Sequence, residues 1–150
     1  MIQYLTKLEE LRTRLLKCTK HLTTQQINYI PPGFKNNIIW NIGHELAVSD
    51  DILYGNIESM KPQYPFDITK FKKGSKPEQI VDTDTVASIK EAFGATVPNF
   101  LRLMSQASLA HPELQYDKVV RRIISNASLS FLIFHEEMHI QVVDRMLLLL

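Results

Sequence analysis

Phe131-Leu-Ile-Phe-His135-Glu-Glu-Met-His139-Ile-Gln-Val-Val143 has the periodicity of the middle of a long helix. His135 and His139 are four residues apart, so their side chains stack on one face of that helix. The same face carries Ser128, Phe131, Leu132, Met138, Val142 and Met146, and the opposite face carries Glu137, Gln141 and Asp144. We therefore predict two imidazoles on an inward stripe, where water cannot easily satisfy their nitrogens.

The spacing of these two histidines has two interpretations. Two buried histidines can simply be bonded to a neighbouring carbonyl or carboxylate. Alternatively, they can bind a metal ion. The chain has five histidines, so the spacing alone is weak evidence. A third inward histidine on another helix would favour the metal.

A second helix is expected from residue 36 to residue 54, with Gly55 as its C-terminal cap. One side of this helix carries Trp40, Asn41, His44, Ala47, Val48 and Asp51. His44 is the third inward histidine, which favours the metal. Asp51 lies two turns further on, so it either orients an imidazole, lines a pocket or is a half-exposed acid at the helix end.

Two further amphipathic helices are predicted. The first covers residues 2–26, with Cys18 and Leu22 on its apolar stripe. The other opens at the N-cap cluster Asp82-Thr-Asp-Thr85 and continues to about residue 109, kinked but not ended by Pro98. The last helix, which carries the histidine pair, is capped by Asn126 or Ser128. A short ordered turn is expected near 119–124, with His111 in a loop and His21 exposed to solvent.

Four long amphipathic helices without a strand pattern predict an all-α fold, a four-helix bundle formed by residues 1–150 as one domain. The connection at 55–82 between the second and third helices is unusually long. It can carry the chain back along the bundle, which would make those two helices parallel. It can also cover a site.

Charge, cysteine content and hydropathy exclude or disfavour several classes of protein. A net charge of +1 gives no electrostatic reason to expect nucleic-acid binding. Cys18 is the only cysteine, which excludes an internal disulfide and favours a cytoplasmic protein. The final Met146-Leu-Leu-Leu-Leu150 is too short to span a membrane. We expect it to pack into the core or against a second subunit of a homodimer.

His135-Glu136-Glu137-Met138-His139 also matches H-E-x-x-H, in which two histidines bind zinc and the glutamate activates water. Three observations oppose a zinc protease. The third ligand of such enzymes lies downstream, yet only 11 residues follow His139. The position of a metzincin's third histidine holds Arg145. No sheet is predicted that could hold an extended peptide.

The motif Trp40-x-x-Gly43-His44, followed by a late His-x-x-x-His, resembles the DinB/YfiT-like superfamily of four-helix bundles along the whole chain. The resemblance implies that His44, His135 and His139 bind one divalent metal and leave coordination positions open. It also implies a thiol-dependent transferase or isomerase that uses a low-molecular-weight thiol. No residue of this chain is matched to a catalytic base.

Three neutral imidazoles suit zinc, nickel or iron(II), and the sequence does not choose among them. An open site of this kind can bind a thiol as thiolate or lower the pKa of bound water. We expect a metal-dependent enzyme acting on a small molecule, with an electrophile held under the 55–82 connection. Trp40, Asn41, Asp51 and Glu136 are candidates for orienting the ligands or lining the pocket. The alternative is a catalytically silent bundle, monomeric or dimeric, in which the metal or the histidine cluster only supports the structure.

Overall fold

The computed structural model describes residues 2–55, 61–110 and 126–150. The described residues form helices and connections and contain no strand, so the all-α prediction is confirmed. The elements are α1 (Ile2–Thr19), α2 (Thr24–Asn28), α3 (Ile38–Leu53), the 3-10 helix η2 (Ile68–Phe71), α4 (Thr83–Ala110) and α6 (Asn126–Leu147). The turn expected near 119–124 and the loop position of His111 lie outside the described residues.

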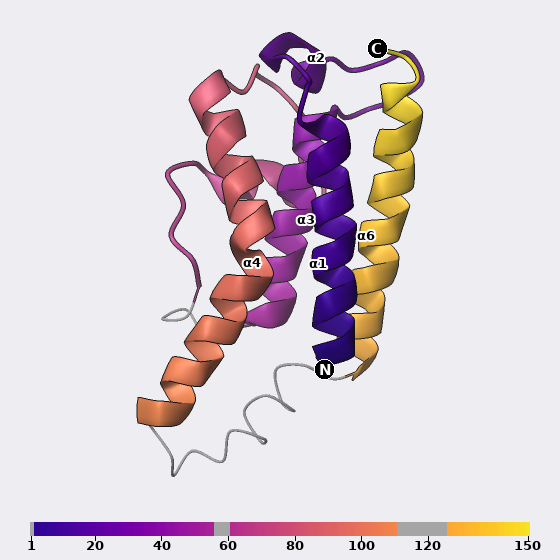
Figure 1. Ribbon diagram of the computed structural model, residues 1–150. Helices are drawn as coiled ribbons and strands as arrows, with labels where there is room; N and C mark the ends of the chain where they lie inside the picture. Colours follow the sequence, from indigo (N-terminus) through magenta and orange to yellow (C-terminus); the bar gives the residue numbers. More distant parts are fainter. Residues whose placement is uncertain (1, 56–60, 111–125) are drawn as a thin grey trace.

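The long helices α1, α3, α4 and α6 pack side by side (Figure 1). The most extensive contacts among these four helices are α1–α6, α6–α3, α3–α4 and α4–α1, and they close a ring. The colours of Figure 1 show that α1 and α6 run in one direction while α3 and α4 run in the other. The parallel course expected for the helices on either side of the 55–82 connection is therefore present, and α3 is antiparallel to α6.

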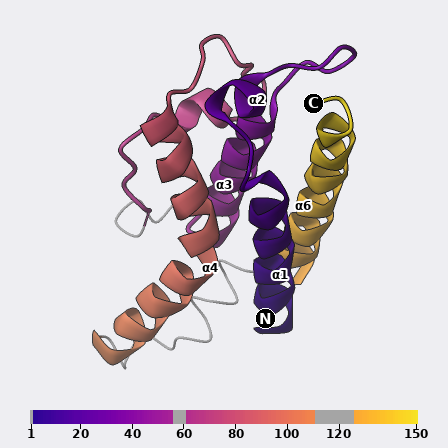
Figure 2. The same cartoon turned by 45° about the horizontal axis from the view of Figure 1, so that its top comes forward.

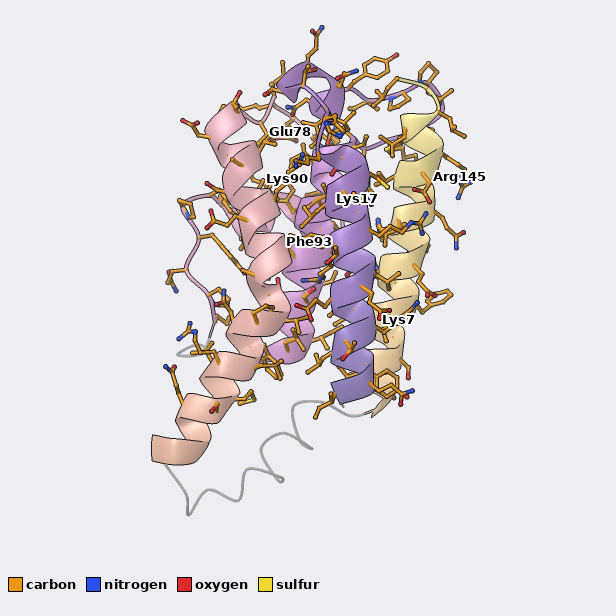
Figure 3. The ribbon with its side chains drawn as sticks, in the orientation of Figure 1. Lys7, Lys17, Glu78, Lys90, Phe93 and Arg145 are labelled. Atoms are coloured by element: carbon orange, nitrogen blue, oxygen red, sulfur yellow. The ribbon has the colours of Figure 1, made fainter. Side chains whose placement is uncertain are left out.

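The first helix is shorter than predicted. It ends at Thr19, and a separate short helix, α2, begins after Thr23. Thr23 and Gln26 form a capping box that starts this new helix. Lys90 of α4 closes the end of α1, because its Nζ donates to the Thr19 carbonyl at 2.9 Å (Figure 3). Cys18, expected on the apolar stripe, is exposed.

α2 lies across the end of the bundle at which α3 begins (Figure 2). The start of α3 is fixed by Asn37, whose Oδ1 accepts from the Trp40 backbone N–H at 2.8 Å. The helix ends before Gly55, whose φ of +55° is the left-handed conformation expected of a glycine cap. Of its 16 residues 13 are buried, so α3 has no polar face and is the central helix of the bundle.

The connection from α3 to α4 is partly ordered by local bonds. Asp67 caps η2 by accepting from the Thr69 N–H at 3.0 Å, and η2 packs against α3. Asp82 caps α4 by accepting from the Thr85 N–H at 2.9 Å, and α4 continues through Pro98 as predicted. Among the helices that the structure describes, none is both long enough and apolar enough to cross a membrane.

The inward face of α6 differs from the predicted one. The buried positions are Leu129, Leu132, Glu136, Ile140, Val143 and Met146. Phe131 and Met138, expected to face inward, are 51% and 41% exposed. The reason is that α6 packs against both α1 and α3. Its inward face is therefore centred on Glu136, and the two histidines lie at the edge of this face rather than in its middle.

Candidate metal centre

Four side chains from two helices converge between α3 and α6. His44 and Glu45 come from α3, and His135 and His139 come from α6. Each offers one potential ligand atom, and these atoms lie within 4.8 Å of one another. The imidazole rings are 4.6 to 5.3 Å apart, centroid to centroid. The three histidines predicted from the sequence are thus brought together, and Glu45 joins them.

The ring of His44 is held by the backbone of the 3-10 helix. Its Nδ1 is 2.7 Å from the carbonyl oxygen of Phe71. A carbonyl oxygen can only accept a hydrogen bond, so Nδ1 carries the proton and Nε2 keeps its lone pair. Trp40 stacks on the same ring, with centroids 4.7 Å apart and an interplanar angle of 11°.

The ring of His139 is held by Asn41. The Nδ1 of His139 is 2.7 Å from Asn41 Oδ1, while the amide nitrogen of Asn41 donates to the carbonyl of Asn37 at 2.7 Å. The amide therefore presents its oxygen to His139, whose Nδ1 must be the donor. As in His44, Nε2 is left with a lone pair, which is the form of histidine that binds a metal.

For the remaining pair, His135 and Glu45, the described residues show no backbone carbonyl or side-chain amide that orients the group. His135 Nδ1 lies 2.7 Å from Glu45 Oε1, yet neither atom has a hydrogen-bond partner among the described residues. The second carboxyl oxygen of Glu45 is also buried, and the carboxyl of Glu136 is near enough to share a hydrogen bond with Glu45 when one of the two acids is protonated. Buried polar atoms left without partners are costly. Three imidazole nitrogens and the Glu45 carboxyl group form a donor set that a divalent cation fits.

The electrostatics of the cluster agree with that fit. Burial, together with the neighbouring His135 and His44, lowers the pKa of His139 to about 4. Burial also lowers the pKa of His44 and of His135. All three imidazoles are therefore neutral at neutral pH, as a ligand must be. Burial raises the pKa of the Glu45 carboxyl to about 8, although the charge of Arg12 and a hydrogen bond with Glu136 act against the rise.

Glu136, the glutamate of the H-E-x-x-H match, lies beside Glu45 but is held by Arg12, unlike a free water-activating base. It is fully buried, and its Oε2 accepts from Nε and Nη2 of Arg12 at 3.3 and 3.1 Å. Arg12 also donates to Ser49 Oγ and to the carbonyl of Phe93, whose ring lies under its guanidinium. Phe93 projects from α4 between that helix and α1 in Figure 3. The arrangement of Glu136 opposes the zinc-protease interpretation.

The other predicted residues take different places. Trp40 and Asn41 contact the histidines directly. Asp51 does not: its side chain is 55% exposed and lies 3.6 Å from Lys72 Nζ. The inward acid is its neighbour Asp50, which accepts from the hydroxyl of Tyr64 at 2.9 and 3.1 Å. Of the three alternatives for Asp51, the exposed acid near the helix end is the one that agrees with the structure, while Asp50 was not singled out because α3 is buried on nearly all sides.

Two residues that the sequence did not indicate are central. Glu45 is fully buried beside the histidines, and Arg12 is buried at the centre of the bundle. Arg12 follows the spacing of Leu5, Leu8 and Leu15, which places it on the inward side of α1. That spacing was the available signal for Arg12. The sequence signal for Glu45 was weaker: it lies within a helix whose residues are mostly apolar on both sides of it.

A cavity of about 610 Å³ lies beneath the α3–α4 connection. Its walls include Trp40 and Phe71, both of which also contact His44. None of the four potential ligand residues lines it. The cluster itself is reached from the side of α6, where the side chains of His135 and His139 are each 13% exposed. There the exposed ring of Phe131 lies 5.4 Å from that of His135.

Comparison with known proteins adds the family. Residues 7–143 match the model of the DinB superfamily. No curated protein and no solved structure matches the chain. The match covers all four long helices in whole or in part, including His44, Glu45, His135 and His139. The resemblance inferred from the spacing of the histidines is confirmed, and the chain belongs to the DinB superfamily.

Proposed function

We propose that this protein is a divalent-metal-dependent enzyme that transfers a low-molecular-weight thiol to an electrophilic small molecule. One observation carries the proposal: three neutral imidazoles and a buried carboxyl group converge at an edge of the bundle that solvent can reach. His44, His135 and His139 would hold the metal, and Glu45 is a further candidate ligand. Zinc, nickel and iron(II) all suit this donor set.

The surroundings of the cluster support a reaction rather than a closed structural site. A structural zinc site surrounds its metal with protein ligands, whereas a catalytic site leaves a position for water or substrate. Here the carbonyl of Phe71 and the amide of Asn41 fix two of the rings without entering the cluster. The exposed edges of His135 and His139, flanked by the Phe131 ring, give a small molecule access.

The chemistry is a nucleophilic substitution or addition at carbon. When bound, the metal would stabilise the thiol as its thiolate at neutral pH. The sulfur forms a bond to the electrophilic carbon, and the electron pair of the broken bond leaves with the leaving group or moves onto the acceptor atom. The thiol proton is released to solvent at the exposed edge. Phe131 provides an apolar surface for the non-reacting part of the electrophile.

The first test is metal binding. The purified protein, stripped with a chelator and titrated with zinc, nickel and iron(II), is expected to bind one equivalent of metal per chain. His44→Ala is expected to lower the affinity by at least 100-fold. His21→Ala is the matched control, because His21 is exposed and far along the chain from the cluster. Equal metal uptake by wild type and His44→Ala would overturn the proposal.

The second test is an open coordination position. Cobalt(II) substituted into the site reports its ligands through its visible spectrum. Adding a small thiol is expected to produce a sulfur-to-cobalt charge-transfer band that His44→Ala lacks. A screen of thiols against alkylating and epoxide electrophiles then tests turnover. Stoichiometric metal with no response to thiols and no turnover would instead identify a silent bundle in which the metal supports the fold.

A further inference from the structure

The ring of Phe71 lies directly on Gly43, the residue before His44. A Cβ atom at position 43 would be 2.4 Å from Cδ1 and 2.5 Å from Cγ of Phe71. Those contacts are far inside van der Waals distance. Cγ is close to the Phe71 backbone, so a rotation of the ring about its own axis would not remove the clash. Glycine at this position therefore allows η2 to approach α3 closely.

The same residue holds His44 through its backbone. Phe71 is 5% exposed and its carbonyl oxygen lies 2.7 Å from His44 Nδ1. A side chain at position 43 that pushed the Phe71 ring away would carry the carbonyl with it. The position of the ring on Gly43 thus fixes the position of the acceptor that sets the tautomer of His44.

The connection holds His44 at a second point. Trp40 stacks on the imidazole, and its Nε1 donates to Ser75 Oγ at 3.1 Å. The hydroxyl of Ser75 in turn donates to the carbonyl of Lys70 at 2.6 Å. The segment from residue 67 to residue 75 therefore constrains both the edge of the His44 ring, through Phe71, and its face, through Trp40.

We propose that residues 67–75 are a positioning element for His44, seated on the helix by the contact of Phe71 with Gly43. Phe71 acts through its carbonyl, and Gly43 acts by leaving room for Phe71. Hydrogen bonds of this kind orient the ligands of metal sites and typically change metal affinity 10- to 100-fold. The inference rests on the proposed metal site for its consequence, but the positioning itself is present in the metal-free protein.

The test uses Gly43→Ala, Phe71→Ala and the double variant. In the metal-free protein, two-bond ¹⁵N–¹H correlation spectra report which nitrogen of His44 carries the proton. Wild type is expected to show the Nδ1–H form, and Gly43→Ala a mixture with the Nε2–H form. Metal affinity is expected to fall about 10- to 100-fold in Gly43→Ala. In the double variant, loss of the ring makes room for the new methyl group, so the tautomer and most of the affinity are expected to return.

Gly94→Ala is the matched control. Gly94 also lies within a helix, but a Cβ there meets only the tip of the Leu16 side chain, at 3.1 Å. This variant should leave the His44 tautomer and the metal affinity unchanged. Dispersed amide spectra establish that each variant is folded. The positioning role is rejected if folded Gly43→Ala keeps the wild-type tautomer, or if the double variant recovers no more than Gly43→Ala alone.

The two proposals fail separately. If the wild-type protein binds no metal, the proposed function is lost, while the tautomer of His44 in Gly43→Ala still decides the positioning role. If metal binds to wild type and to Gly43→Ala equally, with the tautomer unchanged, the metal site survives and the positioning role does not.

Discussion

Two buried clusters, each built around a glutamate, lie next to each other in this bundle, and the two glutamates have different neighbours. In the first, Glu136 is matched by Arg12, a cation that the chain itself supplies. In the second, Glu45 lies among three neutral histidines and beside the Glu136 carboxyl, and among the described residues no Lys or Arg side chain bonds it directly. A buried carboxylate requires compensation in both places. Arg12 bonds Glu136 directly and acts on Glu45 only through its charge, and burial raises the pKa of both carboxyls to about 8.

The largest effect is expected from removing the internal cation. Arg12→Met leaves Glu136 buried without its partner, which should lower the free energy of unfolding by about 3–5 kcal/mol. Urea denaturation in the presence of chelator measures this loss. The double variant Arg12→Met with Glu136→Met removes both charges and should recover much of it.

Arg14→Ala is the control for that substitution, on the same helix. Arg14 pairs with Asp144, but their side chains are 55% and 37% exposed. Loss of such a pair should cost no more than about 1 kcal/mol. If Arg12→Met lowered the free energy of unfolding no more than Arg14→Ala does, the buried Arg12–Glu136 pair would contribute no more to stability than an exposed pair.

Removing the charge of the second cluster should have two opposite consequences. Glu45→Gln replaces a poorly compensated carboxylate by a neutral amide of similar shape, so the metal-free protein should become more stable at pH 8. Metal affinity should fall by about 10-fold or more, because a charged oxygen donor is lost. Chemical denaturation in chelator and metal titration measure the two quantities. A variant that loses stability without metal would show that Glu45 is already satisfied by the protein.

A third buried acid gives an intermediate case. Asp50 is bonded by the neutral hydroxyl of Tyr64, and burial raises the pKa of Asp50 to about 6. The folded protein then binds more protons than the unfolded one between about pH 4 and pH 6, so the contribution of Asp50 to stability falls as the pH rises through that window. The Tyr64 hydroxyl limits this loss by stabilising the carboxylate.

Tyr64→Phe should therefore destabilise the protein by about 1–2 kcal/mol at pH 7. Its effect should shrink below about pH 4, where Asp50 is protonated in both states. Denaturation curves at pH 4 and pH 7 for both proteins test the sign. An effect that is equal at the two pH values would mean that the hydroxyl stabilises packing rather than the charge of Asp50.

The sequence predicts one of the two clusters far better than the other. Histidines are uncommon on apolar stripes, so three of them on inward positions of two helices pointed to a common site, and the structure brings them together. Arg12 and Glu136 are 124 positions apart, and each is of a type rarely buried unless paired. Neither residue identifies the other without the fold, which is why the internal ion pair could not be predicted.

The limits of periodicity explain the remaining differences. Helical spacing assumes one buried face, which suits α4 and fails for α3, where 13 of 16 residues are buried. For that reason helical spacing did not indicate that Asp50 is buried, whereas Asp51 is exposed. The early end of α1 had a signal of its own in the capping pair Thr23 and Gln26, but the apolar spacing of Leu22 outweighed it.

Trp40 is the only tryptophan of the chain, and its indole lies flat against His44. The tryptophan fluorescence of the unlabelled protein therefore originates at one place, beside the cluster. A paramagnetic ion held by the histidines would quench that emission. A molecule entering the 610 Å³ cavity, which the same indole lines, would instead shift its wavelength. The native chain thus carries an optical probe that can separate occupancy of the cluster from occupancy of the cavity in a single titration.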